Sequence, residues 1–357
     1  MEVFETDRNW KRRAVSVPVW FASLTFLTVL LPVLLPVAVL ADLLRRRPSA
    51  MARTYVFFTW FFATECFGLV GAAALWLARP LVRDEAWYRL ANRKLQRIWA
   101  RGLFWGAVRI YGIRLSIDGL EALEDERPAL VLSRHASTLD TMIPLAIVRQ
   151  LKRFGYVIKA ELLMDPALDI VAQRFPNAFV RRGGPDPERE IAKVLELGRD
   201  LGPGAAVVVY PEGTRFSEEK RAQLLEKFEA CGDDERLAIA RRLKRTLPPL
   251  REGGMRLIEE MREADLVIVA HRGIDRGSSM AALFAGGMTH AGLDIAIWRI
   301  PAVEVPRERE KIQAYLVDIW AEVDRFACGE ARSAADLRAE GRKDERRLRT
   351  GPPLVSR

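Results

Sequence analysis

The first eighty residues contain two long apolar runs. The run from Ala14 to Ala41 has no charged side chain, and the run from Thr54 to Ala78 has only one, Glu65. A helix needs about 20 predominantly apolar residues to cross a bilayer, and both runs exceed that length. A cleaved signal peptide has an apolar region of only about 7–15 residues, so the first run favours a retained helix. Residues 1–80 are therefore predicted to form a membrane anchor with two hydrophobic helices, at about 14–41 and 54–78.

Prolines and one carboxyl group interrupt these predicted helices. Pro32 and Pro36 lie within the first run, where each removes a backbone hydrogen bond, so we expect a kink there. Glu65 lies in the middle of the second run, where an ionisable side chain is costly. The simplest expectation is a protonated Glu65 that hydrogen-bonds to the first helix through Thr25 or Thr28.

Basic residues flank the predicted hairpin and also fill its loop. The flanks contain Arg8, Lys11, Arg12 and Arg13 before the first run, and Arg79, Arg83, Arg89, Arg93, Lys94 and Arg97 after the second. The loop contains Arg45, Arg46, Arg47 and Arg53. Because the flanks are the more basic, the positive-inside rule favours cytoplasmic ends and a hairpin that crosses twice. The basic loop leaves a re-entrant hairpin, which never crosses, as the alternative.

Residues 81–112 have the pattern of a basic amphipathic helix. Between Glu85 and Tyr111, large apolar side chains share one face and the arginines lie largely elsewhere. That face comprises Trp87, Ala91, Leu95, Ile98, Gly102 and Trp105. Tryptophan and arginine on one amphipathic helix are typical of a membrane interface, so an interfacial helix is predicted. Packing of the helix on a soluble domain is the alternative.

From residue 113 to residue 328, short apolar segments alternate with amphipathic ones. The expected strands are Arg114–Ile117, Ala129–Leu132, Tyr156–Ile158, Ala205–Tyr210, Leu266–Ala270 and Ile295–Ile300, and the expected helices are Thr138–Arg149, Glu188–Leu201, Gly254–Ala264 and Arg309–Phe326. This alternation predicts an α/β domain with a mixed sheet covered by helices. Residues 218–250 are highly charged and interrupt the alternation, which predicts a helical insertion. Residues 329–357 nearly lack large apolar side chains, which predicts a charged, disordered tail.

The net charge and the cysteine and histidine content narrow the possible chemistry. A formal net charge of +9 favours an anionic surface or substrate. No nucleic-acid motif is present, and the apolar runs make phospholipid, rather than nucleic acid, the expected anionic partner. The three cysteines have no pairing pattern, as expected of free thiols in a reducing compartment. The three histidines form no Cys/His cluster, so no metal site is expected.

A histidine and an aspartate lie five positions apart, directly after a predicted buried strand. His135 and Asp140 follow the run Ala129–Leu132 across a strand-to-helix turn. If a helix begins near Ser137 or Thr138, Asp140 falls in its first turn and can reach back to one ring nitrogen of His135. A carboxylate in that position fixes the imidazole tautomer and leaves the other nitrogen free as a base. The pair is therefore the candidate catalytic group.

A second candidate segment follows the apolar run Ala205–Val209. It contains Glu212, Gly213, Thr214 and Arg215, on a loop at the end of a predicted strand. Ligands in open α/β sheets bind at such strand ends. Gly213 lets backbone N–H groups approach an anion, Thr214 adds a hydroxyl, and Arg215 adds a planar fork that matches phosphate. For this segment alone, an ordinary tight turn with a surface arginine is the alternative.

Three further cations are candidates for the same edge of the sheet. Arg181 and Arg182 follow Phe179–Val180, and Lys159 follows the strand Tyr156–Ile158. Two adjacent arginines at a strand end can bind a phosphate. A solvated surface pair is the alternative for the arginines, and a surface position is the alternative for Lys159.

The other two histidines are expected to be non-catalytic. His271 ends a predicted strand, and His290 lies in a glycine-rich stretch. Neither has a carboxylate at a helical or turn spacing that would orient its ring.

In this order, the motifs resemble those of the glycerolipid acyltransferase family, which includes the 1-acylglycerol-3-phosphate acyltransferases. The first family motif, a His and an Asp separated by four residues, matches His135 and Asp140, with Arg134 in place of the usual Asn. The third motif, Pro-Glu-Gly-Thr-Arg, matches residues 211–215 without change.

The other family motifs match less closely. Arg181 or its neighbour Arg182 corresponds to the arginine of the second motif, and residues 159–162 resemble a Lys-x-Glu-Leu segment of the family. The fourth motif corresponds to residues 266–270, which lack the usual proline. The resemblance covers roughly residues 115–305.

The resemblance implies an O-acyltransferase that moves a fatty acyl group from acyl-CoA or acyl-carrier protein to the free hydroxyl of a lysophospholipid. The implied acceptor is 1-acylglycerol-3-phosphate, which gives phosphatidic acid. His135 would be the general base and Asp140 would orient it. The implied phosphate ligands are Lys159, Arg181, Arg182 and Arg215, and the residues that shape the loop are Glu212, Gly213 and Thr214. The thioester is a co-substrate, and no metal or other cofactor is implied.

Three alternatives remain beside this function. They are a phospholipid transacylase, an acyltransferase for another lysolipid such as an ornithine lysolipid, and a non-catalytic lipid-binding membrane protein. Because thioester donors are cytoplasmic, the expected location is the plasma (inner) membrane, with the catalytic domain on the cytoplasmic face.

Overall fold

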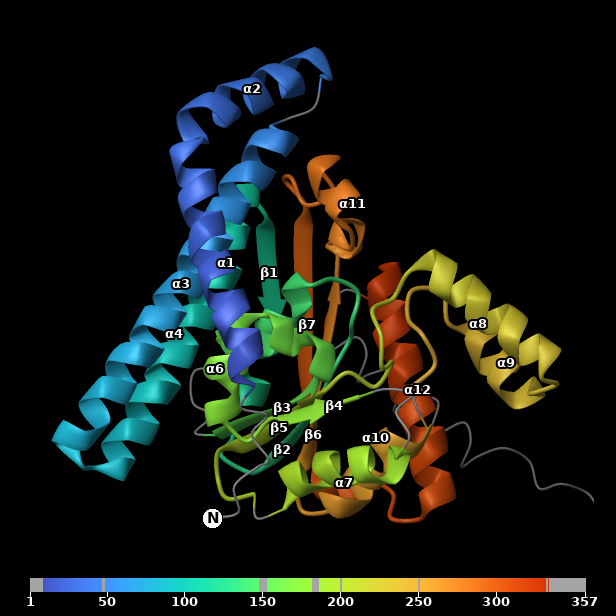
Figure 1. Ribbon diagram of the computed structural model, residues 1–357. Helices are drawn as coiled ribbons and strands as arrows, with labels where there is room; N and C mark the ends of the chain where they lie inside the picture. Colours follow the sequence, from blue (N-terminus) through green and yellow to red (C-terminus); the bar gives the residue numbers. More distant parts are fainter. Residues whose placement is uncertain are drawn as a thin grey trace, which may run out of the picture.

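The computed structural model describes residues 9–46, 49–147, 153–181, 186–199, 201–249, 251–331 and 333. In this part of the chain, a long arm of N-terminal helices lies beside an α/β domain (Figure 1). The domain contains a sheet with helices on both of its faces. The predicted fold class, an α/β domain with a mixed sheet covered by helices, is confirmed.

The sheet is mixed because one pair of neighbouring strands is antiparallel. Its strands are β1 (Arg114–Asp118), β2 (Ala129–Ser133), β3 (Arg153–Lys159), β4 (Ala178–Val180), β5 (Ala205–Val209), β6 (Asp265–Arg272) and β7 (Gly292–Ile300). They are arranged in the order β1-β7-β6-β2-β5-β3-β4. Strands β6 and β7 are antiparallel, and the other neighbouring pairs are parallel. The carboxyl ends of β2, β3, β4, β5 and β6 therefore meet at one edge.

The central strands β2 and β5 are buried along their whole length. Their residues form unbroken apolar runs because helices cover both faces, as is usual for parallel strands. One face packs against α4 (Glu85–Tyr111), α5 (Ile143–Ile147) and α6 (Pro166–Ile170). The other packs against α7 (Pro187–Gly198), α10 (Arg251–Glu260) and α12 (Arg309–Cys328). Short helices connect these elements: η1 (Leu120–Leu123), η2 (Leu139–Met142), η3 (Ala160–Met164), η4 (Ala172–Arg174), η5 (Asp275–Gly277), α11 (Met280–Phe284) and η6 (Ala302–Glu304).

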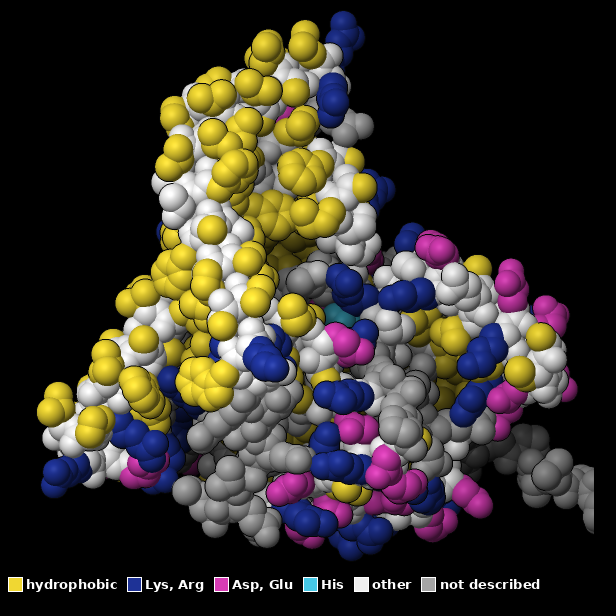
Figure 2. All heavy atoms as spheres, viewed as in Figure 1, with side chains coloured by type: hydrophobic (Ala, Val, Ile, Leu, Met, Phe, Trp, Pro, Cys, Tyr) yellow, Lys and Arg dark blue, Asp and Glu magenta, His cyan; other side chains and the backbone are white. Residues whose placement is uncertain are grey.

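The arm consists of α1 (Trp10–Val29), α2 (Leu31–Leu44) and α3 (Ala50–Val82). Among the described helices, α3 by itself is long and apolar enough to span a membrane. Helices α1 and α2 reach that threshold only together, and they are bent by 68° at their junction, just before Pro32. A broken span and a re-entrant loop both accommodate such a bend. Apolar side chains cover the arm, whereas charged ones dominate the surface of the domain (Figure 2), which supports association of the arm with lipid.

Glu65 finds its hydrogen-bond partner in α4, so the prediction that it would bond to the first helix was wrong. Its Oε1 accepts a hydrogen bond of 3.0 Å from Nε1 of Trp99, whereas its Oε2 is buried without a hydrogen-bond partner in the described part of the chain. The predicted partner Thr25 donates to a carbonyl of its own helix. The physical reason is that α3 packs against α4, so Glu65 faces the interior.

Helix α4 has the bounds that its sequence pattern predicts. Of its predicted apolar face, Leu95 is buried, whereas Ile98 and Trp105 are exposed. Trp99 lies on the buried side, against α3. The interfacial position of this helix stays a prediction.

The α-helix predicted at Thr138–Arg149 begins later than expected. The segment starts as the 3-10 turn η2 and continues as α5, which is described over Ile143–Ile147. The carboxylate of Asp140 accepts the backbone N–H groups of Ala136 and Ser137, and this holds a tight loop where the first helical turn was expected. Residues 148–152 lie outside the described part.

Residues 218–250 contain a helical hairpin that projects from the domain (Figure 1). Helices α8 (Glu218–Ala230) and α9 (Asp234–Arg242) begin at Ser217 and Asp233, whose side chains accept backbone N–H groups of the first turn. Phe228 packs against α9 from within the hairpin. The tail predicted from residue 329 lies almost entirely outside the described residues.

Candidate active site

The candidate catalytic residues meet because their strands are parallel neighbours. β2 lies between β5 and β6, so the residues that follow these strands share one edge of the sheet. His135 follows β2, Glu212 follows β5, and His271 lies at the end of β6. This edge is the usual place for a ligand in an open α/β sheet.

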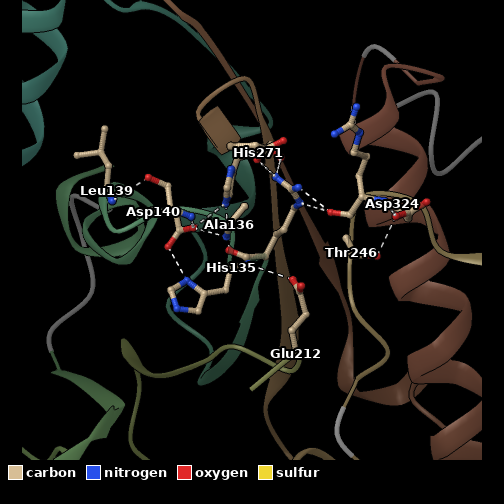
Figure 3. Close-up of polar contacts among 12 residues, drawn as sticks. His135, Ala136, Leu139, Asp140, Glu212, Thr246, His271 and Asp324 are labelled. Atoms are coloured by element: carbon tan, nitrogen blue, oxygen red, sulfur yellow. Dashed lines mark hydrogen bonds and ion pairs between the residues drawn. The ribbon is translucent and has the colours of Figure 1, made fainter. Parts of the chain in front are cut away.

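His135 and Asp140 form a hydrogen-bonded pair (Figure 3). Nδ1 of His135 lies 2.9 Å from Oδ1 of Asp140. The partner assigns the tautomer: because a carboxylate accepts, Nδ1 carries the proton and Nε2 is left as the base. Asp140 is fully buried, whereas the His135 side chain is 17% exposed, so only the histidine has access to a substrate.

Asp140 remains ionised because its hydrogen bonds outweigh its burial. Burial by itself raises the pKa of this carboxyl, but hydrogen bonds with His135 and His271 lower the pKa to well below its usual range. The backbone N–H groups of Ala136 and Ser137 also donate to Oδ2, each at 2.6 Å. The carboxylate is therefore held in one orientation, with Oδ1 directed at His135.

Glu212 holds the backbone of the site instead of facing solvent. Its Oε1 accepts the backbone N–H of His135 at 3.0 Å, and its Oε2 accepts that of Leu247 at 3.0 Å. Burial raises the pKa of Glu212 to about 8, against the opposing effects of Arg134 and the two amides. Gly213 adopts a φ of 70°, in the left-handed region that favours glycine, and turns the chain directly after Glu212.

Arg215 lies beside the loop that carries the His135–Asp140 pair. Its Nη1 donates to Oγ1 of Thr138 at 2.7 Å. Thr214 is engaged elsewhere, because its Oγ1 accepts a hydrogen bond of 2.8 Å from Nζ of Lys220. Of the predicted phosphate ligands, the structure thus brings Arg215 next to the pair.

Lys159 and Arg181 lie at the same edge of the sheet and are exposed. Lys159 ends β3, and its Nζ is 3.6 Å from Oε1 of Glu161. Arg181 follows β4, and its backbone N–H donates to Glu190 at 2.7 Å. Arg182 lies outside the described residues. In the described part, these two cations share the edge with His135 but make no contact with it.

Two residues of the site were missed from the sequence. His271 is fully buried, with Nε2 3.0 Å from the carbonyl oxygen of Arg134 and 3.4 Å from Oδ2 of Asp140. Arg134 is also fully buried and donates to Asp275, to His271 and to Arg245. Two features of the sequence could have identified them: His271 lies at the end of a predicted strand, and Arg134 directly precedes His135.

Tyr210 and an apolar cavity complete the surroundings. The ring centroids of Tyr210 and His135 are 4.7 Å apart, and the hydroxyl group of Tyr210 is buried. A cavity of about 270 Å³ adjoins Glu212, Gly213 and Thr214, and the rest of its lining comes from α8, α9, α10, α12 and the Pro248–Pro249 segment and is mostly apolar. No group of three His, Cys, Asp or Glu side chains suited to hold a metal occurs among the described residues.

Comparisons with known proteins point to one family. The profile of the family described as Acyltransferase matches residues 114–271. The chain is 22% identical to mouse 1-acyl-sn-glycerol-3-phosphate acyltransferase epsilon over 269 residues, which are 71% of this chain and 72% of that enzyme. It is 28% identical over 130 residues to the lyso-ornithine lipid O-acyltransferase of Rhizobium meliloti (strain 1021), covering 36% of this chain and 40% of that enzyme.

A solved structure shares the fold. It is the crystal structure of the 1-acyl-sn-glycerophosphate (LPA) acyltransferase PlsC from Thermotoga maritima, with a TM-score of 0.55 and 16% sequence identity. The alignment covers 79% of this chain and 98% of that one. At this level of identity the likeness concerns the fold alone.

Proposed function

Because this chain belongs to the glycerolipid acyltransferase family, we propose that it transfers a fatty acyl group from a thioester to the free hydroxyl of a lysophospholipid. The observation that carries the proposal is the hydrogen bond between His135 and Asp140 at the carboxyl edge of the sheet. The first acceptor that we propose is 1-acylglycerol-3-phosphate, for which the mouse relative is named, with phosphatidic acid as the product. Acyl-CoA and acyl-carrier protein are the two candidate donors.

His135 supplies the base for this reaction. Its Nε2 removes the proton of the acceptor hydroxyl while the oxygen attacks the carbonyl carbon of the thioester. The new C–O bond forms, the C–S bond breaks, and the imidazolium returns the proton to the leaving thiolate. Asp140 keeps the proton on Nδ1 and stabilises the imidazolium in between.

Arg215 is the first candidate ligand for the acceptor phosphate. Its guanidinium lies beside Thr138, on the loop between His135 and Asp140, and a planar fork matches phosphate oxygens. Lys159, Arg181 and Arg182 are proposed to add positive charge at the same edge. Glu212, Gly213 and Thr214 shape the loop that carries Arg215.

A lyso-ornithine lipid is the second candidate acceptor. The observation that favours it is the 28% identity to an enzyme named for that substrate. An ornithine headgroup offers a carboxylate, which the fork of Arg215 matches as well as it matches phosphate. The two acceptors therefore share one site in this proposal.

A panel of acceptors and donors tests the proposed function. Membranes that contain the full-length chain are incubated with a labelled fatty acyl group, on CoA, on carrier protein or on a diacyl phospholipid. The acceptors are lysophosphatidate, lyso-ornithine lipid and lysophosphatidylcholine, and we expect labelled diacyl product from a thioester and lysophosphatidate. Label transferred only from the phospholipid would indicate a transacylase. If folded protein in the membrane gives no product with any pair of donor and acceptor, a non-catalytic lipid-binding protein becomes the better interpretation.

His135→Ala is the matched control for this panel. Loss of a general base typically lowers the rate by about 10²–10⁴-fold. A variant that is folded and keeps more than about a tenth of the wild-type rate would contradict the proposed role of His135.

The location of the enzyme is also a proposal. The apolar surface of the arm and the basic residues that flank it support attachment to the plasma (inner) membrane, with the catalytic domain in the cytoplasm. A lysolipid could then keep its acyl chain in the bilayer while its headgroup reaches His135.

A further inference from the structure

Two polar side chains behind the His135–Asp140 pair are completely enclosed. Arg134 follows β2 and His271 lies in β6, and both have 0% of their surface exposed. Removing a guanidinium group from water costs free energy, which its hydrogen bonds must offset. The acyl-transfer mechanism proposed for His135 and Asp140 uses neither side chain.

His271 bridges Asp140 and the backbone next to His135 (Figure 3). Its Nε2 lies 3.0 Å from the carbonyl oxygen of Arg134 and 3.4 Å from Oδ2 of Asp140. Both neighbours are acceptors, so Nε2 carries a proton and donates it. The other ring nitrogen, Nδ1, is buried without a hydrogen-bond partner in the described part of the chain. The polar contacts of this ring are therefore all made by its Nε2–H group.

Arg134 and His271 hold each other in place. Nη1 of Arg134 donates to the carbonyl oxygen of His271 at 3.0 Å and to Oδ1 of Asp275 at 2.7 Å, while His271 donates to the carbonyl oxygen of Arg134. β2 and β6 are neighbouring parallel strands. The two side chains thus lock the ends of these strands together directly before His135.

The donors to Asp140 differ in where they come from. The backbone N–H groups of Ala136 and Ser137 belong to the same short loop as Asp140 and move with it. His271 belongs to β6, in the centre of the domain. The two amides hold the Asp140 carboxylate only to its own loop, whereas His271 connects it to the sheet.

We propose that His271, held by Arg134, is a positioning residue for acyl transfer, which ties the carboxylate of Asp140 to the sheet and keeps Oδ1 directed at His135. The inference rests on the proposed roles of His135 and Asp140. His271 acts only through Asp140 and does not touch the substrate.

Loss of the Nε2–H group has two expected effects. The carboxylate gains freedom, which lowers kcat because the base is no longer held in the reactive geometry. With one donor fewer, Asp140 also interacts more strongly with the imidazolium of His135, so the acid limb of kcat/KM shifts to higher pH. A residue that only filled space would lower the amount of folded enzyme and leave the pH profile unchanged.

Several charged or titratable groups surround His271, and the test leaves all of them unchanged. They are Asp140 and Arg134, which contact His271, and the groups that these two residues and the His135 backbone contact in turn, namely His135, Asp275 and Glu212.

The test compares His271→Gln with His271→Asn in the full-length chain in its membrane. The amide nitrogen of glutamine can occupy roughly the place of Nε2, whereas that of asparagine reaches only the place of Nδ1. We expect the Gln variant to stay close to wild type. We expect the Asn variant to lose about 10–100-fold in kcat, as happens when the outer hydrogen-bond partner of a metal-bound histidine is removed. Its KM for the lysolipid should change little, and its acid limb should move to higher pH.

Two controls separate this inference from the proposed function. His290→Asn changes a histidine far from the catalytic pair in sequence, after α11, and should behave as wild type. His135→Ala, measured in parallel, tests the catalytic pair itself: an active His135→Ala variant would refute the proposed function. Equal kcat values and pH profiles for the Gln and Asn variants, with His135→Ala inactive, would overturn the inference alone.

A measurement on the unmodified protein covers the case in which neither variant folds. The chain has three histidines, and loss of signals in His135→Ala and His290→Asn assigns their ¹⁵N ring resonances. The remaining resonances belong to His271, and we expect its Nε2 to carry a proton between about pH 5 and pH 9. An Nε2 without a proton anywhere in that range would overturn the inference.

Discussion

At the scale of single residues, the buried groups of the site hold its backbone, and the exposed groups are accessible to a substrate. His135 is partly exposed, whereas Asp140 and Glu212 are buried and accept backbone N–H groups. These carboxyl groups determine the shape of the loops after β2 and β5. His135 and Arg215 are the groups left to meet a substrate, since both keep some surface at the edge of the sheet.

Asp140→Asn should remove a pH-dependent part of the stability. Burial raises the pKa of Asp140, but the hydrogen bonds with His135 and His271 outweigh it and lower the pKa. A carboxyl group with a lowered folded-state pKa stabilises fully above its unfolded-state pKa of about 3.9, and this contribution is lost as pH falls through the folded-state value. The difference in unfolding free energy between wild type and Asp140→Asn should therefore shrink below about pH 4.

Urea unfolding of detergent-solubilised protein, followed by tryptophan fluorescence, measures this difference at each pH. A difference that stays constant or grows on acidification would count against an ionised Asp140 in the folded state.

Arg215→Ala should raise the KM for the lysolipid much more than the KM for the thioester. The guanidinium lies 2.7 Å from Thr138 beside the catalytic pair, and its loss removes a bidentate partner for the headgroup. Arg215→Lys should restore only part of the affinity, because an ammonium cannot reproduce the planar fork. Steady-state kinetics with each substrate varied in turn is the measurement, and equal effects on both KM values would indicate a structural role.

The contact between His135 and Asp140 and the loop after β5 could be predicted because each motif is local. His135 and Asp140 lie on one short loop after an apolar run, so spacing alone brings them together. Arg134 and His271 could not be paired in this way, because their contact depends on β2 and β6 being neighbours. No local pattern reports the order of strands in a sheet.

At the scale of elements, a cluster of charges ties the arm to the domain. The side chains of Arg12 and Arg13 in α1 donate to the carboxylate of Asp169 in α6, at distances from 2.7 to 3.2 Å. Asp169 is fully buried, and Gln173 also donates to it. The start of α1 is thus held against the domain, at the end of the arm opposite to α2 (Figure 1).

Asp169→Ala should destabilise the protein strongly. The substitution leaves two partly buried arginines without their carboxylate, and breaking a buried ion pair costs about 3–5 kcal/mol. Glu229→Ala is the matched control, because it breaks an ion pair with Arg241 whose side chains are 67% and 61% exposed, and exposed pairs contribute about 0–1 kcal/mol. Thermal unfolding in detergent compares the two variants, and similar midpoints would contradict a stabilising role for Asp169.

Helices and strands could be predicted where the pattern of apolar residues alone determines their type and bounds. The bounds of α4 follow from its amphipathic period, and the fully apolar segments became β2 and β5. The first apolar run became two helices, and the bend of 68° between them lies just before Pro32, where the sequence predicted a kink. The helix after β2 begins later than predicted because the side chain of Asp140 binds the backbone N–H groups of Ala136 and Ser137.

At the scale of the whole molecule, the apolar and the charged surfaces are separate. The arm carries the apolar side chains, and the domain with its projecting hairpin of α8 and α9 carries the charged ones (Figure 2). A surface divided in this way suits a protein whose arm contacts lipid while its catalytic domain stays in water.

Chemical labelling tests the proposed orientation. Cys231, which directly follows α8, is exposed, whereas Cys66 is buried. A maleimide that cannot cross membranes should label Cys231 in inverted inner-membrane vesicles and not in intact spheroplasts, because only the former expose the cytoplasmic face. Cys231→Ser identifies the labelled site and corrects for the partly buried Cys328. Labelling in intact spheroplasts would contradict a cytoplasmic catalytic domain.

The buried Glu65 links biogenesis of the arm to that of the domain. While the chain is being translated, α3 emerges with a carboxyl group in the middle of its apolar length, which is costly in lipid. Trp99, its donor, is synthesised 34 residues later, in α4. Glu65 therefore reaches its final environment only after α4 has been made and has packed against α3. Because α4 also packs against the sheet, the order of synthesis couples the burial of this acid to the docking of the arm on the domain.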